Sequence, residues 1–448
     1  MAHALMRRTF LKQGALAAGA ALSSSFAAVQ RLSVETPRSV MPDFPAADPS
    51  WRATWNAALA LLARNVRMLP RYDKPVLVEG STYAGIWQEC APQEGLVYGN
   101  LQRYIDTPSG SVAPLQIARA NHMAFFAQQK PDGQLPASIK LADLPGSTNG
   151  YGQIQMVVPI AATAWELAQL TQDEELLETA YRSCSRWDAW LRRYRNTRRT
   201  GLVEGFCTYD TGQDNSPRWA GIPNRCPDAD ARRCPADRTL PRLCPDLSAA
   251  AFGARIALAA MAREMGRNSD HARWMADAEH IRQLILRRLY SAEDGAFYDL
   301  DAQNKFVRIR GDAMVRVLGE HVVDPVKDRH IFENVWDRQI HNPTAFWSPY
   351  PLPSIALDDP RFVRPIPRNS WGGASQALTA LRAPRWMTYY RKDAELRELM
   401  QQWCKAILRR MEFRQQMDPL TGQFTQDDPG GYSPAALVFL DFAQRLYT

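Results

Sequence analysis

Hydrophobic residues recur along much of this chain at steps of three and four positions, the spacing of a helix with one buried face. The pattern is clearest between positions 268 and 289, where the recurring residues are Trp274, Ala278, Ile281, Ile285 and Leu289. Ser269 and Asp270 are suited to cap the start of this helix, and Gly266 is suited to end the alanine-rich helix before it. The two segments therefore predict a helical hairpin.

Similar helix pairs are spread over the sequence. In three places the second helix begins at an acidic residue and runs through a basic stretch to a glycine-containing hairpin, at 173–201, 270–295 and 393–422. Further helices are predicted at 51–66, 112–129, 247–266, 372–390 and 433–446. Hairpins whose inner helices are rich in small and apolar residues cannot each bury two faces alone, so we expect them to pack around a shared core.

About six hairpins of about 45 to 70 residues would account for the chain after its first segment. This predicts an all-α fold in which a closed ring of inner helices is surrounded by outer ones. An open α-solenoid is the alternative, but its repeats are more uniform in length, whereas long proline- and tryptophan-rich insertions separate the units here. A ring would gather these insertions at one mouth, where a site can form.

The first 28 residues have the composition of an export signal. Paired arginines, Arg7 and Arg8, precede an alanine-rich apolar region that ends in small residues at 25–27. This segment resembles a twin-arginine signal, so we expect the twin-arginine export machinery as a partner and a periplasmic or secreted mature protein. The predicted organisation is a signal at 1–28, a linker at 29–48 and one large domain at 49–448.

The charge and hydropathy of the remaining chain exclude two classes of partner. Removing the signal's three basic residues lowers the formal net charge from +7 to +4, and the remaining basic residues alternate with acidic ones. That charge is too small and too dispersed for nucleic-acid binding. The densest basic cluster, at 192–199, falls at the expected end of a helix, where cations oppose the dipole. No apolar run beyond the signal is long enough to span a bilayer, so no membrane association is expected after cleavage.

Seven cysteines occur in a chain predicted to enter an oxidising compartment. Cys226, Cys234 and Cys244 are each followed by proline in a polar insertion, and Cys207 lies just upstream. These spacings do not fit a zinc site, and the seven histidines show no metal-ligand pair. We therefore expect one or two disulfides of open connectivity in this insertion, and neither a metal nor a cofactor.

The stretch YDTGQDNSPRW, at 209–219, concentrates two carboxylates, an amide, an arginine and two aromatic rings within one predicted insertion. A surface turn would need only Asp, Gly and Pro. The additional Tyr209, Arg218 and Trp219 are typical of a sugar site, where flat rings cover the apolar face of a pyranose and planar polar groups pair with hydroxyls. The stretch therefore predicts part of a carbohydrate-binding active site.

The segment GQDNSPRW, at 212–219, resembles a motif of the (α/α)6-barrel glycoside hydrolases related to trehalase, processing α-glucosidase and mannosylglycerate hydrolase. Further matching pieces lie, in family order, at 132–136, 151–165, 294–301, 369–373 and 418–422. The resemblance implies an (α/α)6 toroid whose long loops form the active-site mouth. It also implies a metal-independent, inverting hydrolase that cleaves an α-glycosidic bond in a small saccharide or glycan, with Asp214 as general acid.

The same comparison and the local composition suggest which residues hold the sugar. Trp87 and Gln88 lie in a stretch that resembles the first sugar-binding hairpin of the family, and Trp371 precedes two glycines that permit close backbone approach. Arg218 is expected to point to sugar hydroxyls or to hold the loop, because pairing with Asp214 would oppose the protonation of an acid. The predicted substrate-binding residues are Trp87, Gln88, Gln155, Arg218, Trp219, Trp347, Asn369 and Trp371.

An inverting enzyme needs a second carboxylate, about 6.5 to 9.5 Å from the acid, to activate water. The family places a glutamate three residues before the Asp-Pro of the last hairpin, and here that position is Gln415, whose amide cannot accept a proton. Glu89 is our predicted base. Glu94, Glu412 and Asp418 are the alternatives.

Gln415 also leaves other functions open. Water could be activated by a different arrangement, or the protein could bind a sugar without cleaving it. A polysaccharide lyase or epimerase on the same toroid is the third class, and such chemistry abstracts a carbon-bound proton, usually with His, Tyr or Lys.

Overall fold

The computed structural model of the chain describes residues 41–107, 111–142, 150–367, 370–425 and 431–448. All of them lie in one compact unit, Arg38–Thr448. The predicted signal at 1–28 and most of the predicted linker at 29–48 lie outside the described residues. The described part contains twelve α-helices in two layers.

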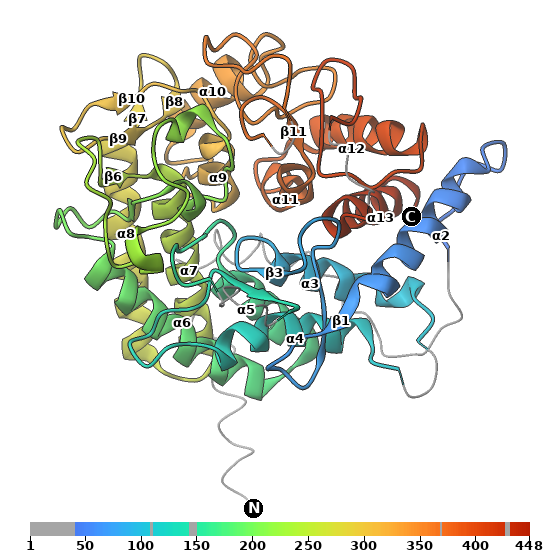
Figure 1. Cartoon of the computed structure of the whole chain (residues 1–448), viewed down its shortest axis with the longest axis horizontal. Coiled ribbons are helices and arrows are strands. Elements are labelled where there is room, and N and C mark those ends of the chain that lie inside the picture. Colours follow the sequence, from blue (N-terminus) through green and yellow to red (C-terminus); the bar gives the residue numbers. More distant parts are fainter. Residues whose placement is uncertain (1–40, 108–110, 143–149, 368–369, 426–430) are drawn as a thin grey trace, which may run out of the picture. The chain divides into compact units, whose positions relative to one another are not determined.

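The helices alternate along the chain between an inner and an outer layer (Figure 1). The inner helices are α3 (Ala91–Asn100), α5 (Ile160–Thr171), α7 (Pro245–Glu264), α9 (Ala313–Gly319), α11 (Ala377–Met387) and α13 (Ser433–Tyr447). The outer helices are α2 (Ser50–Asn65), α4 (Pro114–Ala127), α6 (Glu174–Tyr194), α8 (Asn268–Arg288), α10 (Arg329–Val335) and α12 (Asp393–Leu408).

The inner helices form a closed ring. Each contacts the next one along the chain, and α13 contacts α3. Most outer helices pack on the inner helix that precedes them, as α4 does on α3 and α8 on α7. Helix α2 instead packs on α13, so that the first and the last described helix of this unit lie together. The prediction of a closed ring is therefore confirmed, and the open solenoid is excluded.

Helix α8 illustrates how the sequence pattern produces the fold. Trp274, Ala278, Ile281 and Ile285 are all buried, as the spacing of three and four predicts. The helix begins at Asn268 after Arg267, slightly earlier than the capping residues indicated. The inner helices do not have a single buried face. Their many small residues let neighbouring helices pack closely, so that a helix such as α7 is buried on most sides.

Helix α6 shows the expected end effects. The side chain of Asp173 accepts a hydrogen bond from the backbone N–H of Leu176 at 2.8 Å and so caps the first turn. Arg192 and Arg193 lie in the last turn, as predicted for the basic cluster. Arg195, from the same cluster, is instead fully buried and pairs with Asp210, so the cluster is not wholly a solvated helix end.

Short antiparallel strands join the insertions between helices. One sheet has the order β10 (Phe306–Val307), β9 (Asp299–Leu300), β6 (Arg242–Leu243), β5 (Glu204–Gly205). The two-stranded pairs are β1 (Val66–Met68) with β2 (Pro75–Leu77), β3 (Gly85–Trp87) with β4 (Ser138–Lys140), β7 (Tyr290–Ser291) with β8 (Ala296–Phe297), and β11 (Ser375–Gln376) with β12 (Gln416–Met417). Single turns of other helix types occur at Gln102–Tyr104, Thr208–Asp210, Pro217–Trp219, Pro227–Ala229 and Trp336–Ile340.

The prediction of disulfides in the cysteine-rich insertion is wrong for this structure, in which all seven cysteines are free. The sulfurs of Cys207 and Cys226 lie 3.7 Å apart, in contact but unbonded. Cys234 is partly exposed and packs beside them, and Cys244 is buried at the start of α7. Packing and hydrogen bonds therefore hold this insertion in the structure.

Among the described residues, none of the helices is both long enough and apolar enough to cross a membrane.

Candidate active site

A cavity of about 370 Å³ opens among the segments that lead into the inner helices. Its lining includes five of the sequence-predicted site residues, Trp87, Glu89, Gln155, Asp214 and Trp371, and also Gln415. Glu89 lies just before α3, and Gln155 precedes α5. The ring thus brings together residues more than 300 positions apart in the sequence.

A buried ion pair fixes the insertion that carries Asp214. Asp210 is paired with Arg195, and its carboxylate also accepts hydrogen bonds from the backbone N–H groups of Ile154 at 2.9 Å and Phe206 at 2.7 Å. The backbone carbonyl of Asp214 accepts a hydrogen bond from the N–H of Trp371 at 3.0 Å. Asp214 is therefore held between two segments of the cavity wall.

Glu89 lies against this same insertion. Its Oε1 accepts a hydrogen bond from Nε2 of Gln155 at 3.1 Å, and its Oε2 has no hydrogen-bond partner among the described residues. A Cβ added to Gly212 would collide with that Oε2. Burial and the charge of Asp214 raise the pKa of Glu89 to about 8, although nearby Arg382 and Arg316 act in the opposite direction.

Glu79 is a cavity carboxylate that sequence reasoning missed. It is 3% exposed and accepts a hydrogen bond at Oε1 from the hydroxyl of Tyr432 at 2.7 Å. Burial and the charges of Glu94 and Glu89 raise its pKa well above the usual range. It follows the short strand β2 and belongs to none of the recognised motifs, so the sequence contained no signal for it.

Tyr83 links Glu79 to Gln415. The hydroxyl of Tyr83 donates to Oε1 of Gln415 at 2.8 Å, and its ring lies 5.9 Å from that of Tyr432 and 5.6 Å from that of Trp87. Glu79, Tyr83 and Gln415 all line the cavity. They form one group of contacts, and the charges of Asp214 and Glu89 also raise the pKa of Tyr83.

The aromatic side chains of the cavity are Trp87, Trp371, Tyr83 and Tyr209. Trp371 is 2% exposed and packs with Leu378 and Trp87. The guanidinium of Arg316 lies 5.1 Å from the centroid of the Trp371 ring and supports it from the side of the inner helices. Flat apolar rings beside carboxylates and amides suit the two kinds of surface on a pyranose.

Four predicted substrate-binding residues, Gln88, Arg218, Trp219 and Trp347, do not line the cavity. Nε2 of Gln88 donates to the backbone carbonyl of Pro136 at 3.1 Å. The indole nitrogen of Trp219 donates to Thr211 at 2.9 Å, and that of Trp347 lies 3.3 Å from Glu398. In each of these three, the polar group has a hydrogen-bond partner within the protein. Asn369 lies outside the described residues.

Arg218 serves the insertion itself, the second of the two roles expected for it. Its guanidinium is 6% exposed, pairs with Asp246 at 2.7 Å and with Asp299 at 2.5 Å, and donates to Gln213 at 2.9 Å. These contacts tie the segment of Asp214 to the start of α7 and to β9. Arg218 therefore holds the loop and does not line the cavity.

The alternative bases weighed from the sequence also lie outside the cavity lining. Glu94 is fully buried in α3, and burial raises its pKa to about 7. Glu412 pairs with Arg414 at 2.8 Å. Asp418 accepts hydrogen bonds from the backbone N–H groups of Leu420 at 2.8 Å and Thr421 at 3.1 Å, which makes it a turn residue.

Two clusters among the described residues have the composition of metal sites, Cys207–Asp210–Cys226 and Cys244–Asp246–Asp299. In both, arginine already pairs with the carboxylates: Arg195 with Asp210, and Arg218 with Asp246 and Asp299. The guanidinium groups supply the positive charge that these carboxylates require.

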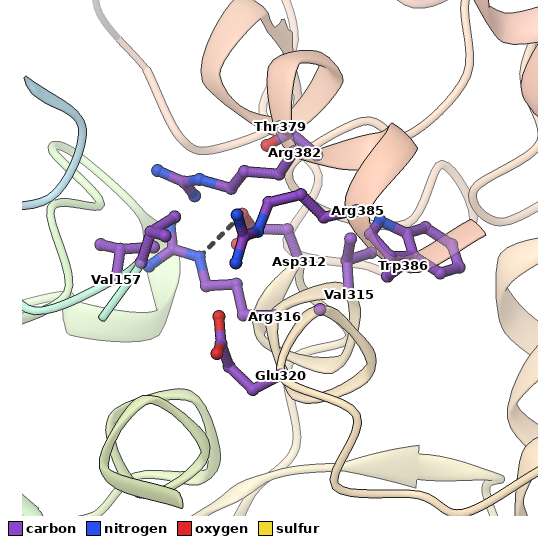
Figure 2. A pocket seen from close by; sticks show the side chains of 11 residues that line it. Val157, Asp312, Val315, Arg316, Glu320, Thr379, Arg382, Arg385 and Trp386 are labelled. Atoms are coloured by element: carbon purple, nitrogen blue, oxygen red, sulfur yellow. Dashed lines mark hydrogen bonds and ion pairs between the residues drawn. The ribbon is translucent and has the colours of Figure 1, made fainter. Parts of the chain in front are cut away.

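A second, smaller internal cavity is lined by side chains of α9 and α11 and by the segment before α5 (Figure 2). Arg316, Arg382 and Arg385 reach into it together with Glu320. None of the three guanidinium nitrogens of Arg382 has a hydrogen-bond partner among the described residues, and burial lowers its pKa to about 10. Arg316 and Arg382 also act on Glu89, so they place positive charge beneath the larger cavity.

Comparison with known proteins identifies relatives of this arrangement. Residues 112–433 match the family model described as the mannosylglycerate hydrolase MGH1-like glycoside hydrolase domain. No curated protein sequence matches the chain.

Several solved structures share the fold. The GH63 mannosylglycerate hydrolase from Thermus thermophilus in complex with glucose aligns at 19% identity over 87% of this chain and 100% of that one, with a TM-score of 0.65. Neutral trehalase from Saccharomyces cerevisiae aligns at 13% identity over 83% and 74%, with a TM-score of 0.59. The rhamnosidase from Klebsiella oxytoca with rhamnose bound aligns at 11% identity over 91% and 65%, with a TM-score of 0.56. The predicted (α/α)6 fold is confirmed.

Proposed function

Because the chain belongs to the MGH1-like mannosylglycerate hydrolase family of glycoside hydrolases, we propose that it cleaves an α-glycosidic bond in a short saccharide or glycosylated acid, with inversion. The observation that carries this proposal is the cavity of about 370 Å³ in which buried carboxylates and tryptophan rings lie together. A pocket of that volume suits a small ligand with most of its surface enclosed.

In the proposed reaction Asp214 is the general acid. It donates a proton to the glycosidic oxygen as the bond to the anomeric carbon breaks, while an ionised carboxylate removes a proton from the attacking water. The closeness of several carboxylates favours one protonated and one ionised group, because carboxylates that repel each other cannot all be ionised at neutral pH. Two further carboxylates line the cavity and are available to act on water, Glu89 and Glu79.

We propose that the preferred substrate carries a negatively charged leaving group. Lys140 and Arg225 line the cavity, and Arg225 is exposed where a leaving group could reach it. The mannosylglycerate hydrolase of Thermus thermophilus has been crystallised with glucose and with Tris and D-glycerate. A hydroxy acid linked to a hexose would place its carboxylate beside these two cations.

The experiment is the release of reducing sugar from a panel of α-linked disaccharides and α-glycosyl hydroxy acids. Asp214→Asn should lower kcat/KM about 10²-fold or more on any substrate that the wild type cleaves, because a general acid contributes at least that much. Glu412→Gln is the control, since Glu412 is partly exposed and lies outside the cavity lining. Equal activity of Asp214→Asn and the wild type would refute the assignment of the acid.

A sugar-binding protein without activity is the second candidate, favoured by the amide of Gln415 in the cavity. Binding of a panel sugar by calorimetry, with no product after prolonged incubation at several pH values, would support it over hydrolysis.

We also propose that residues 1–28 direct export through the twin-arginine machinery, on the basis of Arg7, Arg8 and the apolar segment after them. Replacing both arginines by lysine should retain the full-length precursor in the cytoplasm, as detected by fractionation and immunoblotting. Unchanged export of this variant would refute the proposal.

A further inference from the structure

The three carboxylates of the cavity do not have equivalent surroundings. Glu89 lies against Gly212, only two residues from Asp214 in the chain, so it shares the wall that carries the proposed acid. Glu79 instead contacts Tyr432, whose ring lies beside Tyr83, the hydrogen-bond partner of Gln415. A base that activates water must stand across the sugar from the acid, and in an inverting enzyme it stands about 6.5 to 9.5 Å away.

The electrostatic neighbours of the two glutamates agree with this placement. Asp214 is the foremost charge acting on the pKa of Glu89. Among the charges that raise the pKa of Glu79, Asp214 comes after Glu94 and Glu89.

Glu79 is also oriented for reaction with a small molecule in the cavity. Only Oε1 is engaged by Tyr432, and the backbone on either side is pinned: the N–H of Glu79 donates to Gly85 at 3.0 Å, and the N–H of Ser433 donates to the carbonyl of Glu79 at 2.8 Å. Because α13 begins at Ser433, the closed ring itself holds this carboxylate in place. A group fixed in this way needs no reorganisation to accept a proton.

We propose that Glu79 is the base that activates water in this enzyme, in place of a carboxylate at position 415. This inference rests on the proposed function.

The step balances without a cofactor. The water oxygen forms a bond to the anomeric carbon while the bond from that carbon to the leaving oxygen breaks. A carboxylate oxygen of Glu79 takes one proton from the water, and Asp214 gives its proton to the leaving oxygen. Glu79 then holds one proton more and Asp214 one fewer, and exchange with solvent restores both.

The pH dependence follows from the groups that face Glu79. They are Glu89, Glu94, Asp214, Cys90, Tyr83 and Tyr432. Burial and the acidic neighbours raise the pKa of Glu79, and the hydrogen bond from Tyr432 lowers it by a smaller amount. A base must be ionised, so the acidic limb of the kcat/KM profile should lie well above pH 4.5, the ordinary value for a glutamate.

The test compares Glu79→Gln, Glu89→Gln and Asp214→Asn on two substrates, the glycoside that the wild type cleaves and the matching α-glycosyl fluoride. The fluoride ion departs without needing a proton. Asp214→Asn should therefore regain most of its lost activity when the substrate is the glycosyl fluoride. Glu79→Gln should lose about 10²-fold or more in kcat on both substrates, because water activation is needed for both. The glutamine oxygen can still accept from Tyr432, so thermal stability should be unchanged.

A second variant separates chemistry from folding. Gln415 lines the same cavity and is joined to the Glu79 group through Tyr83. The double variant Glu79→Gln, Gln415→Glu should therefore regain at least about 10-fold of the lost activity. Full activity of Glu79→Gln, or restoration of that variant by the fluoride, would overturn the inference. A wild type that cleaves no panel substrate and no fluoride would instead overturn the proposed function.

Discussion

At the scale of single residues, the cavity depends on a position where no side chain fits. Gly212 has a φ of +63°, in the left-handed region, and faces Oε2 of Glu89 directly. The glycine therefore lets two chemically important segments approach each other, the one before α3 and the one that carries Asp214.

Gly212→Ala should lower the free energy of unfolding by about 1–3 kcal/mol through overpacking and should also lower kcat, because either Glu89 or the Asp214 segment must move. Chemical denaturation and steady-state kinetics would measure the two effects.

Gly221→Ala is the matched control, since Gly221 has a φ of +80° but nothing near its added Cβ. Its cost should be limited to the backbone term of about 1 kcal/mol, with kcat unchanged. If both variants had the same free energy of unfolding and the same kcat, the contact with Glu89 would contribute to neither property.

The titration of Glu89 gives a second prediction at this scale. Its pKa is about 8 in the folded protein, whereas an unfolded glutamate titrates near 4.5. Between these values the folded state binds the extra proton, so this group's contribution to stability falls as pH rises, by up to about 1.4 kcal/mol per pH unit.

Glu89→Gln should make the decline of the free energy of unfolding between pH 5 and 8 shallower, as followed by urea denaturation at each pH. Glu412→Gln should leave the slope unchanged, because Glu412 is partly exposed and paired with Arg414. An unaltered slope in Glu89→Gln would mean that this carboxyl is ionised throughout the range.

At the scale of elements, one arginine joins three segments. Arg218 in the insertion pairs with Asp246, at the start of α7, and with Asp299, in β9, and both carboxylates are 1% exposed. Removing the arginine would leave the buried charge of Asp299 without an ion-pair partner among the described residues and Asp246 with only Arg316 at 3.5 Å.

Arg218→Met should therefore cost about 3–5 kcal/mol in the free energy of unfolding and lower kcat through displacement of Asp214. Arg218→Lys should not restore either property, because an ammonium cannot make the forked contacts with two carboxylates. Thermal and chemical denaturation would measure the loss.

The same insertion supplies the control. Arg232 pairs with Asp230 at 2.8 Å, but its side chain is 47% exposed. Arg232→Met should change stability by less than about 1 kcal/mol. A similar loss in both variants would contradict the view that burial gives the Arg218 pairs their importance.

At the scale of the whole molecule, the ring is closed by aromatic side chains from the two ends of the described unit. Trp51 in α2 lies 4.9 Å from the ring of Tyr447 and 5.7 Å from that of Phe439, both in α13. Phe44 stacks on Trp51 at 5.6 Å and lies 5.7 Å from the ring of Tyr447.

Trp51→Ala should lower the free energy of unfolding by about 3–5 kcal/mol, the usual cost of removing a large buried aromatic side chain. The transition should remain cooperative, because the inner helices share one core. Val326→Ala, at a site 82% exposed, should have no measurable effect. A Trp51→Ala variant as stable as the wild type would show that α2 is not needed to close the ring.

The sequence allowed prediction of the repeating helix pairs, because the stripe of α8 and the alanines of α7 follow directly from burial on one face or on most faces. It also placed Asp214 and Trp371 in segments that meet at the cavity. It did not distinguish the two roles open to Arg218 and Trp219, since an arginine and a tryptophan beside a carboxylate suit a buried support as well as a sugar.

Glu79 was missed for a different reason. Its partner Tyr432 lies 353 positions away, and the contact exists only because α13 returns to the start of the unit. Local periodicity contains no information about such a pair, which depends on the closure of the entire ring.

The pairing of α2 with α13 also determines when the protein can fold during synthesis. Asn65, at the end of α2, donates to Ser433 across 368 positions, so the partner of α2 is made much later than α2 itself. Until α13 has been made, the side of Trp51 that packs on Phe439 and Tyr447 is uncovered and exposed to aggregation. The nascent chain can stack its middle hairpins early, but the cavity can assemble only after α13 has left the ribosome.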